Sequence, residues 1–104
     1  NLVSSLQAFE TAESLLSIAE ARLPAAIPSG WQQEGTGRYL IENIGQTRQA
    51  FGMPADLPVF LFRITAVAEV PQARVTLESV MAWPATSGQA PARRILWRQL
   101  YRES

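Results

Sequence analysis

One feature constrains this chain more than any other: its helical pattern is confined to a single segment, residues 2–23. In that segment apolar side chains recur at every third or fourth position, which predicts an amphipathic helix with a broad apolar stripe. Further along the chain apolar and polar side chains alternate, as they do in strands. With no helix between the strands, we expect them to pair antiparallel. The sequence therefore predicts an α+β domain in which this long N-terminal helix packs on an antiparallel sheet of roughly four strands.

The expected boundaries divide one domain, residues 1–104, into three parts, because a chain of this length supports one core. The helix occupies residues 1–23 and ends before Pro24, which lacks an amide donor. Residues 24–58 are rich in glycine and proline and are expected to hold one strand. Residues 59–104 are expected to hold the remaining strands. The four strands are expected at 38–44, 59–70, 73–83 and 93–101.

The alternation also assigns side chains to the two faces of the sheet. The strand at 59–70 is expected to present one apolar row: Phe60, Phe62, Ile64 and Ala66. The last strand is expected to separate Ile95, Trp97 and Tyr101 on one face from Arg94, Arg98 and Arg102 on the other. A basic and aromatic run of this kind can mark a nucleic-acid surface, but its alternation favours a solvated sheet face.

Composition excludes several classes of function. The chain has no His and no Cys, which removes a Ser–His nucleophile, a thiolate nucleophile, a disulfide and the usual zinc sites. Nine basic and nine acidic side chains cancel, so no overall charge draws the chain to nucleic acid. Glu10, Glu13 and Glu20 are expected on a helix surface rather than as an acid/base pair of defined separation. We therefore expect no enzyme, no cofactor, no metal ion and no nucleic-acid partner.

Two blocks of the sequence resemble one protein family. Residues 8–16, AFETAESLL, are similar to the pattern A-F-x-A-A-E-x-A-L in the exposed half of the long N-terminal helix of type IV pilins. Residues 62–66 (FRITA) and 73–80 (ARVTLESV) resemble the hairpin Y-R-I-T-A…A-R-V-V-L-Q-S that ends minor pilins of the PilX family. Residues 38–42 and 94–100 are similar to the strands before and after that hairpin, and the matches occur in family order.

The resemblance implies a type IV pilin-like fold and a structural role. Such a subunit is held in the bacterial inner membrane by an apolar N-terminal half-helix, faces the periplasm and enters the extracellular pilus. It joins other minor pilins in the complex that primes pilus assembly, and the major pilin or a tip adhesin are further candidate partners. Since that half-helix and its processing site are absent here, we expect a soluble fragment whose helix continues upstream. Residues 67–72 replace the usual Gly-rich turn, and no disulfide can hold the C-terminal loop.

The same resemblance places a subunit interface on the helix. A stripe wider than one sheet requires, with two glutamates on its edge, suits bundling with helices of other subunits. We expect charge reversal at Glu13 or Glu20 to weaken partner binding without unfolding the domain. The predicted interface residues are Leu2, Leu6, Glu10, Glu13 and Glu20.

Two alternatives stay open. One is a pseudopilin of a type II secretion system, which belongs to the same superfamily of filament proteins. The other is a periplasmic domain that binds a ligand through Trp31, Trp83 or Trp97, for which a deep pocket lined by aromatic side chains is the expected sign. The sequence also leaves open whether the loops at 45–58 or 84–91 carry recognition.

Overall fold

The computed structural model describes residues 2–23, 27–86 and 91–100, in which one helix precedes five strands. The sheet is antiparallel throughout, and each strand pairs with its neighbour in the sequence. The predicted α+β class, with one N-terminal helix and an antiparallel sheet, is confirmed. The elements are α1 Leu2–Arg22, β1 Gln32–Glu34, β2 Gly37–Thr47, β3 Val59–Val70, β4 Ala73–Pro84 and β5 Arg93–Leu100.

The sheet differs from the predicted one at its first edge. The short strand β1 lies in a stretch predicted as loop, where it pairs with the start of β2. β2 continues three residues past Ile44, because a bulge there leaves Ile44 without a cross-strand partner and the pairing resumes at Gly45. Gly45 has a φ of 126° and its amide donates to the side chain of Asn43 at 3.0 Å. The alternation of side chains carries no signal for such an insertion.

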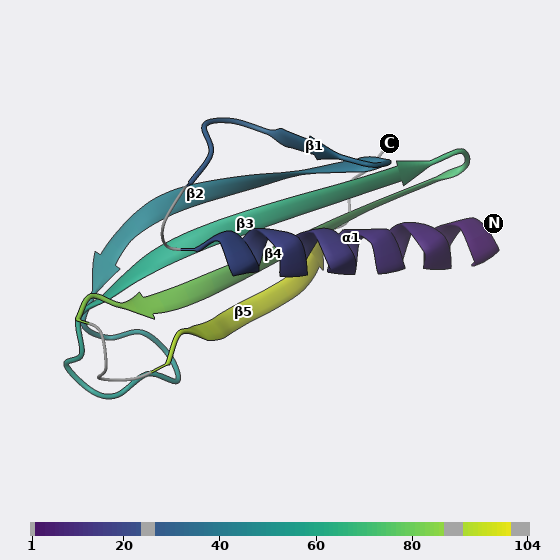
Figure 1. Cartoon of the computed structure of the whole chain (residues 1–104). Coiled ribbons are helices and arrows are strands. Elements are labelled where there is room, and N and C mark those ends of the chain that lie inside the picture. The colour runs from purple at the N-terminus through teal and green to yellow at the C-terminus, as the bar shows by residue number, and fades with distance from the viewer. Residues whose placement is uncertain (1, 24–26, 87–90, 101–104) are drawn as a thin grey trace.

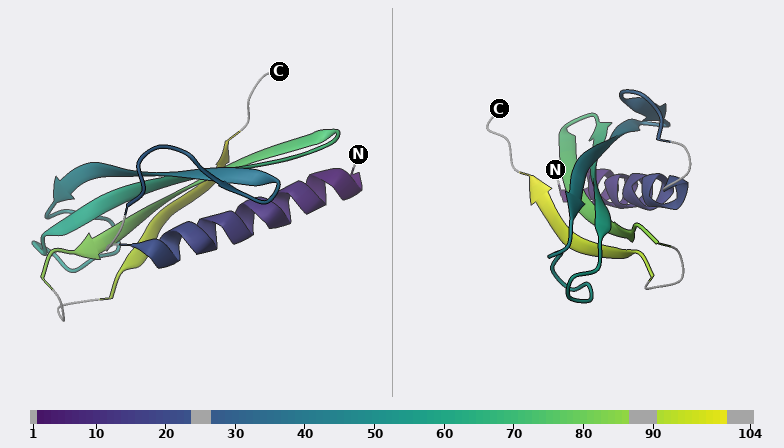
Figure 2. Two further views of the ribbon diagram at one scale, coloured as in Figure 1. Left: turned by 45° about the horizontal axis from the view of Figure 1, so that its top comes forward. Right: turned by 90° about the vertical axis from the view of Figure 1, so that its left-hand side faces the viewer.

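Helix α1 lies lengthwise across one face of the sheet, on the concave side of its curvature (Figures 1 and 2). Three alanines of the helix are fully buried: Ala8, Ala12 and Ala19. Small side chains at the contact allow the helix backbone to approach the strands closely. The approach is tight at Gly37, where an added Cβ would lie 2.5 Å from both Leu15 Cδ1 and the carbonyl oxygen of Val67. The sheet contributes large buried side chains to this core, among them Tyr39, Ile41, Phe62, Ile64 and Leu77.

The core row predicted for β3 is correct for three of its four members. Phe62, Ile64 and Ala66 are buried, whereas Phe60 is 38% exposed. Phe60 pairs with Trp83 near the end of the sheet, and the strands run past the C-terminal end of α1 there (Figures 1 and 2). Burial of this row therefore depends on the length of the helix that covers it.

The outer face, away from α1, has a small apolar cluster of its own. Leu57, Val59 and Ala82 are buried, and side chains of the β2–β3 loop, including Ala50 and Met53, pack against them. The rest of this face carries ion pairs between neighbouring strands. One face of the sheet is thus closed by a helix and the other by a loop and charged side chains.

Substitution of a buried helix leucine should unfold the domain far more readily than substitution of an exposed one. Leu16 is fully buried and Leu6 is 58% exposed on the same helix. We expect Leu16→Ala to lower the free energy of unfolding by about 2–5 kcal/mol, through lost burial and the cavity that remains. Leu6→Ala should change it by less than about 0.5 kcal/mol. Urea unfolding followed by circular dichroism measures both, and equal losses would contradict the assigned core.

Candidate interaction surfaces

The five helix residues of the predicted interface fall into two groups in the structure. Leu2 and Leu6 are 86% and 58% exposed, and Glu10 is exposed as well. Glu13 and Glu20 instead lie on the edge of α1 that faces the last strand, and each is bonded to it. Only the first group therefore remains available to another subunit without a change in this domain.

Glu20 joins the helix to two strands. Its carboxylate accepts two hydrogen bonds from the guanidinium of Arg94, at 2.8 and 2.9 Å, and a third from the hydroxyl of Ser79 at 3.0 Å. Ser79 is fully buried, and the Glu20 side chain is only 18% exposed. A two-point arginine–carboxylate pair fixes distance and orientation together. Glu20 thus sets how β5 sits against α1.

Glu13 makes the second contact between the helix and β5. Its Oε1 accepts a hydrogen bond from the indole Nε1 of Trp97 at 2.9 Å. The Trp97 ring meets Phe9 edge to face, with 6.2 Å between the ring centroids and 70° between the planes, a favoured geometry for aromatic pairs. One turn of the helix therefore provides Trp97 with an apolar contact from Phe9 and a hydrogen-bond acceptor from Glu13.

A bulge in β5 corrects the predicted division of its faces. Met81 pairs with Arg94 and Val80 with Leu96, so Ile95 has no partner across the strand pair. The extra residue shifts the alternation, so that Arg94 and Trp97 both face the helix and bond to it. Arg98 lies on the outer face and Ile95 joins the apolar cluster there. Tyr101 and Arg102, which complete the predicted rows, lie outside the described residues.

Salt bridges connect neighbouring strands across the outer face. Arg98 Nε lies 2.8 Å from Glu78 Oε1, and Glu78 is buried. Arg63 Nε lies 3.1 Å from Glu42 Oε1. The pair of Arg63 and Glu42 lies between half-exposed groups and stabilises the sheet modestly, whereas the pair of Arg98 also satisfies the buried Glu78 carboxylate. At the edge of the face, Arg93 donates to the carbonyl of Gly52 at 2.9 Å and fastens the β2–β3 loop to β5.

Two arginines share Glu69 near the turn of the β3–β4 hairpin. Arg38 Nη1 lies 2.8 Å from Glu69 Oε1, within hydrogen-bond distance, whereas Arg74 Nη2 lies 3.7 Å from the same oxygen. The hydrogen bond from Arg38 and the charge of Arg74 hold the pKa of the Glu69 carboxyl below its ordinary value. The Arg38 guanidinium also lies 5.2 Å from the centroid of the Trp31 ring, a cation–π distance.

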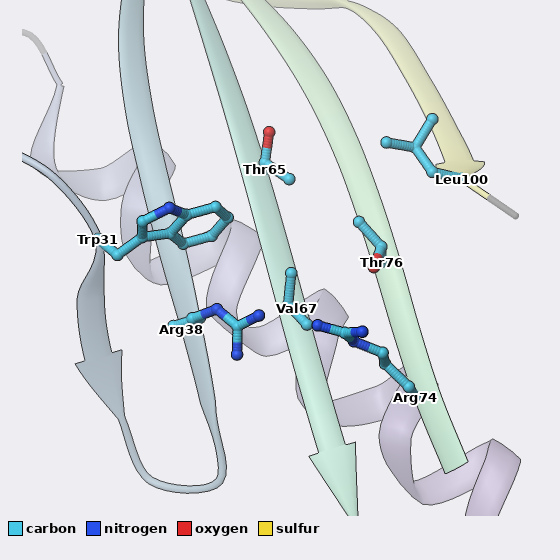
Figure 3. A pocket seen from close by; sticks show the side chains of 7 residues that line it. All are labelled: Trp31, Arg38, Thr65, Val67, Arg74, Thr76 and Leu100. Atoms are coloured by element: carbon cyan, nitrogen blue, oxygen red, sulfur yellow. The ribbon is translucent and has the colours of Figure 1, made fainter. Parts of the chain in front are cut away.

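A hollow of about 200 Å³ opens beside this cluster, on the face away from α1 (Figure 3). Trp31 and Arg38 border it on one side and Arg74 on the other, with Val67 between them. Its lining is completed by three more side chains, Thr65, Thr76 and Leu100. Of these residues sequence reasoning named only Trp31 as a candidate for ligand binding, because the others come from four different strands, β2 to β5.

The three tryptophans do not form a common aromatic site. Trp31 lines the hollow, and Trp97 is held against the helix by Phe9 and Glu13. Trp83 is partly buried and packs against the core between the helix and the sheet. Within the part of the chain that the structure describes, the Trp83 indole nitrogen is buried without a hydrogen-bond partner. A ligand held between several indoles is therefore not supported by their positions.

Over residues 2–23, 27–86 and 91–100, no group of three His, Cys, Asp or Glu side chains is arranged to hold a metal ion. The helix in them is not long and apolar enough to cross a membrane. Comparison of the chain with models of protein families, with curated proteins and with solved structures gave no match.

Loss of the Glu20 carboxylate should loosen β5 from the helix. We expect Glu20→Gln to lower the free energy of unfolding by about 1–3 kcal/mol, because the charged Arg94 keeps only a neutral acceptor. Glu10→Gln is the matched control, since Glu10 is exposed and the structure gives it no ion pair with a described residue. Urea unfolding of both variants makes the comparison. Equal stability of the two would show that Glu20 does not hold the strand.

The Glu69 carboxyl should titrate below its ordinary pKa of 4.5. Because the folded-state pKa is lowered, its contribution to stability is present above pH 4.5 and is lost as the pH falls through the lowered pKa. We expect Arg38→Gln to raise the pKa of Glu69 more than Arg74→Gln does, since only Arg38 bonds to it. Carboxyl ¹³C chemical shifts, followed against pH, measure all three forms. A larger rise in Arg74→Gln would contradict the assigned order.

Proposed function

We propose that this domain is a minor pilin, a structural subunit that primes assembly of a type IV pilus together with other minor pilins. One observation carries the proposal: the first two turns of α1 present three apolar side chains that the sheet leaves uncovered. Leu2, Val3 and Leu6 are 86%, 67% and 58% exposed. Clustered apolar exposure on one helix end marks a surface for a partner.

The position of this surface supports a helix as the partner. The buried side chains of α1 begin at Ala8, so the helix is covered by the sheet only from there onward. Its uncovered turns are still helical, and apolar side chains at this spacing pack well against a second helix. A pilin subunit has this division, with part of its helix on its own sheet and part among the helices of its neighbours.

We limit the proposed interface to those predicted residues that have no bonding role inside this domain. Glu13 and Glu20 are bonded to Trp97 and Arg94, so their replacement would disturb this domain as well as any interface. Leu2, Leu6 and Glu10 have no such internal role among the described contacts. We therefore place the proposed subunit contact on these three residues, with localisation in the inner membrane and pilus as part of the same proposal.

The proposal is tested in the bacterium that encodes the protein. We expect the double variant Leu2→Asp/Leu6→Asp to remove co-purification of other minor pilins and to reduce surface pili several-fold, because two charges then occupy the apolar contact. The isolated domain should keep the melting temperature of the wild type, since both side chains are exposed. Affinity capture, electron microscopy of cells and thermal melting provide the three measurements.

The matched control adds the same two charges elsewhere on α1. Ser14→Asp/Ala21→Asp changes exposed positions further along the helix, and it should leave capture and pilus number at wild-type levels. Normal pili in Leu2→Asp/Leu6→Asp cells with loss of protein secretion would favour the pseudopilin alternative instead. Normal pili together with normal secretion would overturn the assignment to filament assembly.

A further inference from the structure

Arg74, on the outer face of the sheet, has a charge that its neighbours match poorly. Glu42, Glu69 and Glu78 are each within 2.8–3.1 Å of an arginine. Arg74 is left with a contact of 3.7 Å to Glu69, whose oxygen already accepts a hydrogen bond from Arg38. Among the described residues no hydrogen bond accompanies that contact. Two guanidinium groups around one carboxylate leave a net positive charge at this place.

Arg74 borders the hollow opposite Trp31 (Figure 3). Val67 lies between them, and the hydroxyl-bearing side chains of Thr65 and Thr76 lie on the adjoining strands. Trp31 is 45% exposed, and the Arg74 side chain is 44% exposed. The hollow therefore combines two cations, Arg38 and Arg74, with an exposed aromatic ring, a methyl-bearing floor and two threonine side chains.

We propose that this hollow binds a small ring compound that carries one carboxylate, with the carboxylate at Arg74 and the ring over Val67 beside Trp31. A guanidinium can donate two parallel hydrogen bonds to a carboxylate, which gives both strength and orientation. Trp31 and Val67 supply the contact for the body of the ring.

The size of the hollow limits the ligand. Pockets for drug-sized molecules are typically about 300–1,000 Å³, and this hollow measures about 200 Å³. One ring with a carboxylate fits that space, whereas a nucleotide or a folded partner does not. Aromatic acids and sugar acids share this chemistry. The two threonine hydroxyls, which can bond to ring hydroxyls, favour the sugar acid.

The site is independent of the proposed subunit contact. Leu2 and Leu6 lie on α1, which covers the opposite face of the sheet (Figures 1 and 2). A test of the hollow can therefore use the isolated domain, whose elements all belong to one sheet and the helix packed on it. Failure of one proposal leaves the other unaffected.

The test is a titration of the ¹⁵N-labelled domain with sodium glucuronate and with sodium benzoate, at constant ionic strength and pH 7, followed by ¹H–¹⁵N NMR. We expect saturable shifts of the Trp31 indole N–H and the Val67 amide, with a Kd in the millimolar range for at least one acid. Glucose and benzyl alcohol, which lack the carboxylate, should shift the same two signals at least tenfold less at the same concentration. Sodium sulfate tests whether charge alone suffices.

Three variants identify the residues responsible. Arg74→Gln and Trp31→Ala should each raise the Kd about tenfold or more, which corresponds to at least about 1.4 kcal/mol. Arg63→Gln is the matched control, because Arg63 lies on the same face but pairs with Glu42 outside the hollow. All three side chains are partly exposed, and the NMR spectrum reports whether each variant is folded.

The proposal would be overturned by any of four results. These are no saturable shift with either acid, equal binding of the neutral compounds, equal binding of sulfate, or equal weakening by Arg63→Gln and Arg74→Gln. Stronger binding of glucuronate than of benzoate would identify the ligand class as sugar acids. The reverse order would retain the carboxylate site and assign it to aromatic acids.

Discussion

The packing of one helix against one face of the sheet is the constraint on which the rest of this structure depends. Ala8, Ala12 and Ala19 bring α1 close to the strands, and Gly37 leaves no space for a side chain between them. Close approach raises the number of dispersion contacts for each apolar side chain that is buried. Because the described part of the chain has one helix, the opposite face of the sheet must be covered by other groups. The β2–β3 loop, which packs over Val59, and a row of cross-strand ion pairs cover that face.

The edge of the helix shows how polar groups complete an apolar contact. Glu20 and Glu13 lie where the core meets water, and both bond to side chains of β5. Hydrogen bonds to a carboxylate at such a boundary retain most of their strength, and the carboxylate does not pay the full desolvation cost of burial. They also account for the bulge in β5, since only the shifted alternation brings Arg94 and Trp97 to the same face. The two glutamates expected to serve a partner thus have a role within the domain.

Two surfaces remain after these contacts are made, and they differ in chemistry and in place. The first turns of α1 are apolar and uncharged around Leu2 and Leu6, which suits a second helix. The hollow between Trp31 and Arg74 is small, positively charged and on the opposite face. The two proposed ligands, an apolar helix and a small acid, would therefore not compete, since neither surface contributes a side chain to the other. The sequence predicted the first surface from the resemblance to pilins and the width of the helical stripe, and it could not predict the second, whose residues are far apart in the chain.

By itself the sequence determined the class of fold and most of its elements. The 3.6-residue period of the first segment and the two-residue period of the later ones follow from backbone geometry, and neighbouring side chains record them directly. The helical period placed Leu2 and Leu6 on the apolar stripe of the helix, and only the structure showed that the sheet does not cover them. Only the tertiary structure decided the short first strand, the bulges in β2 and β5, and the partners of Glu13, Glu20 and Arg74. Each of these depends on distances between segments remote in the chain, and a local period contains no information about such distances.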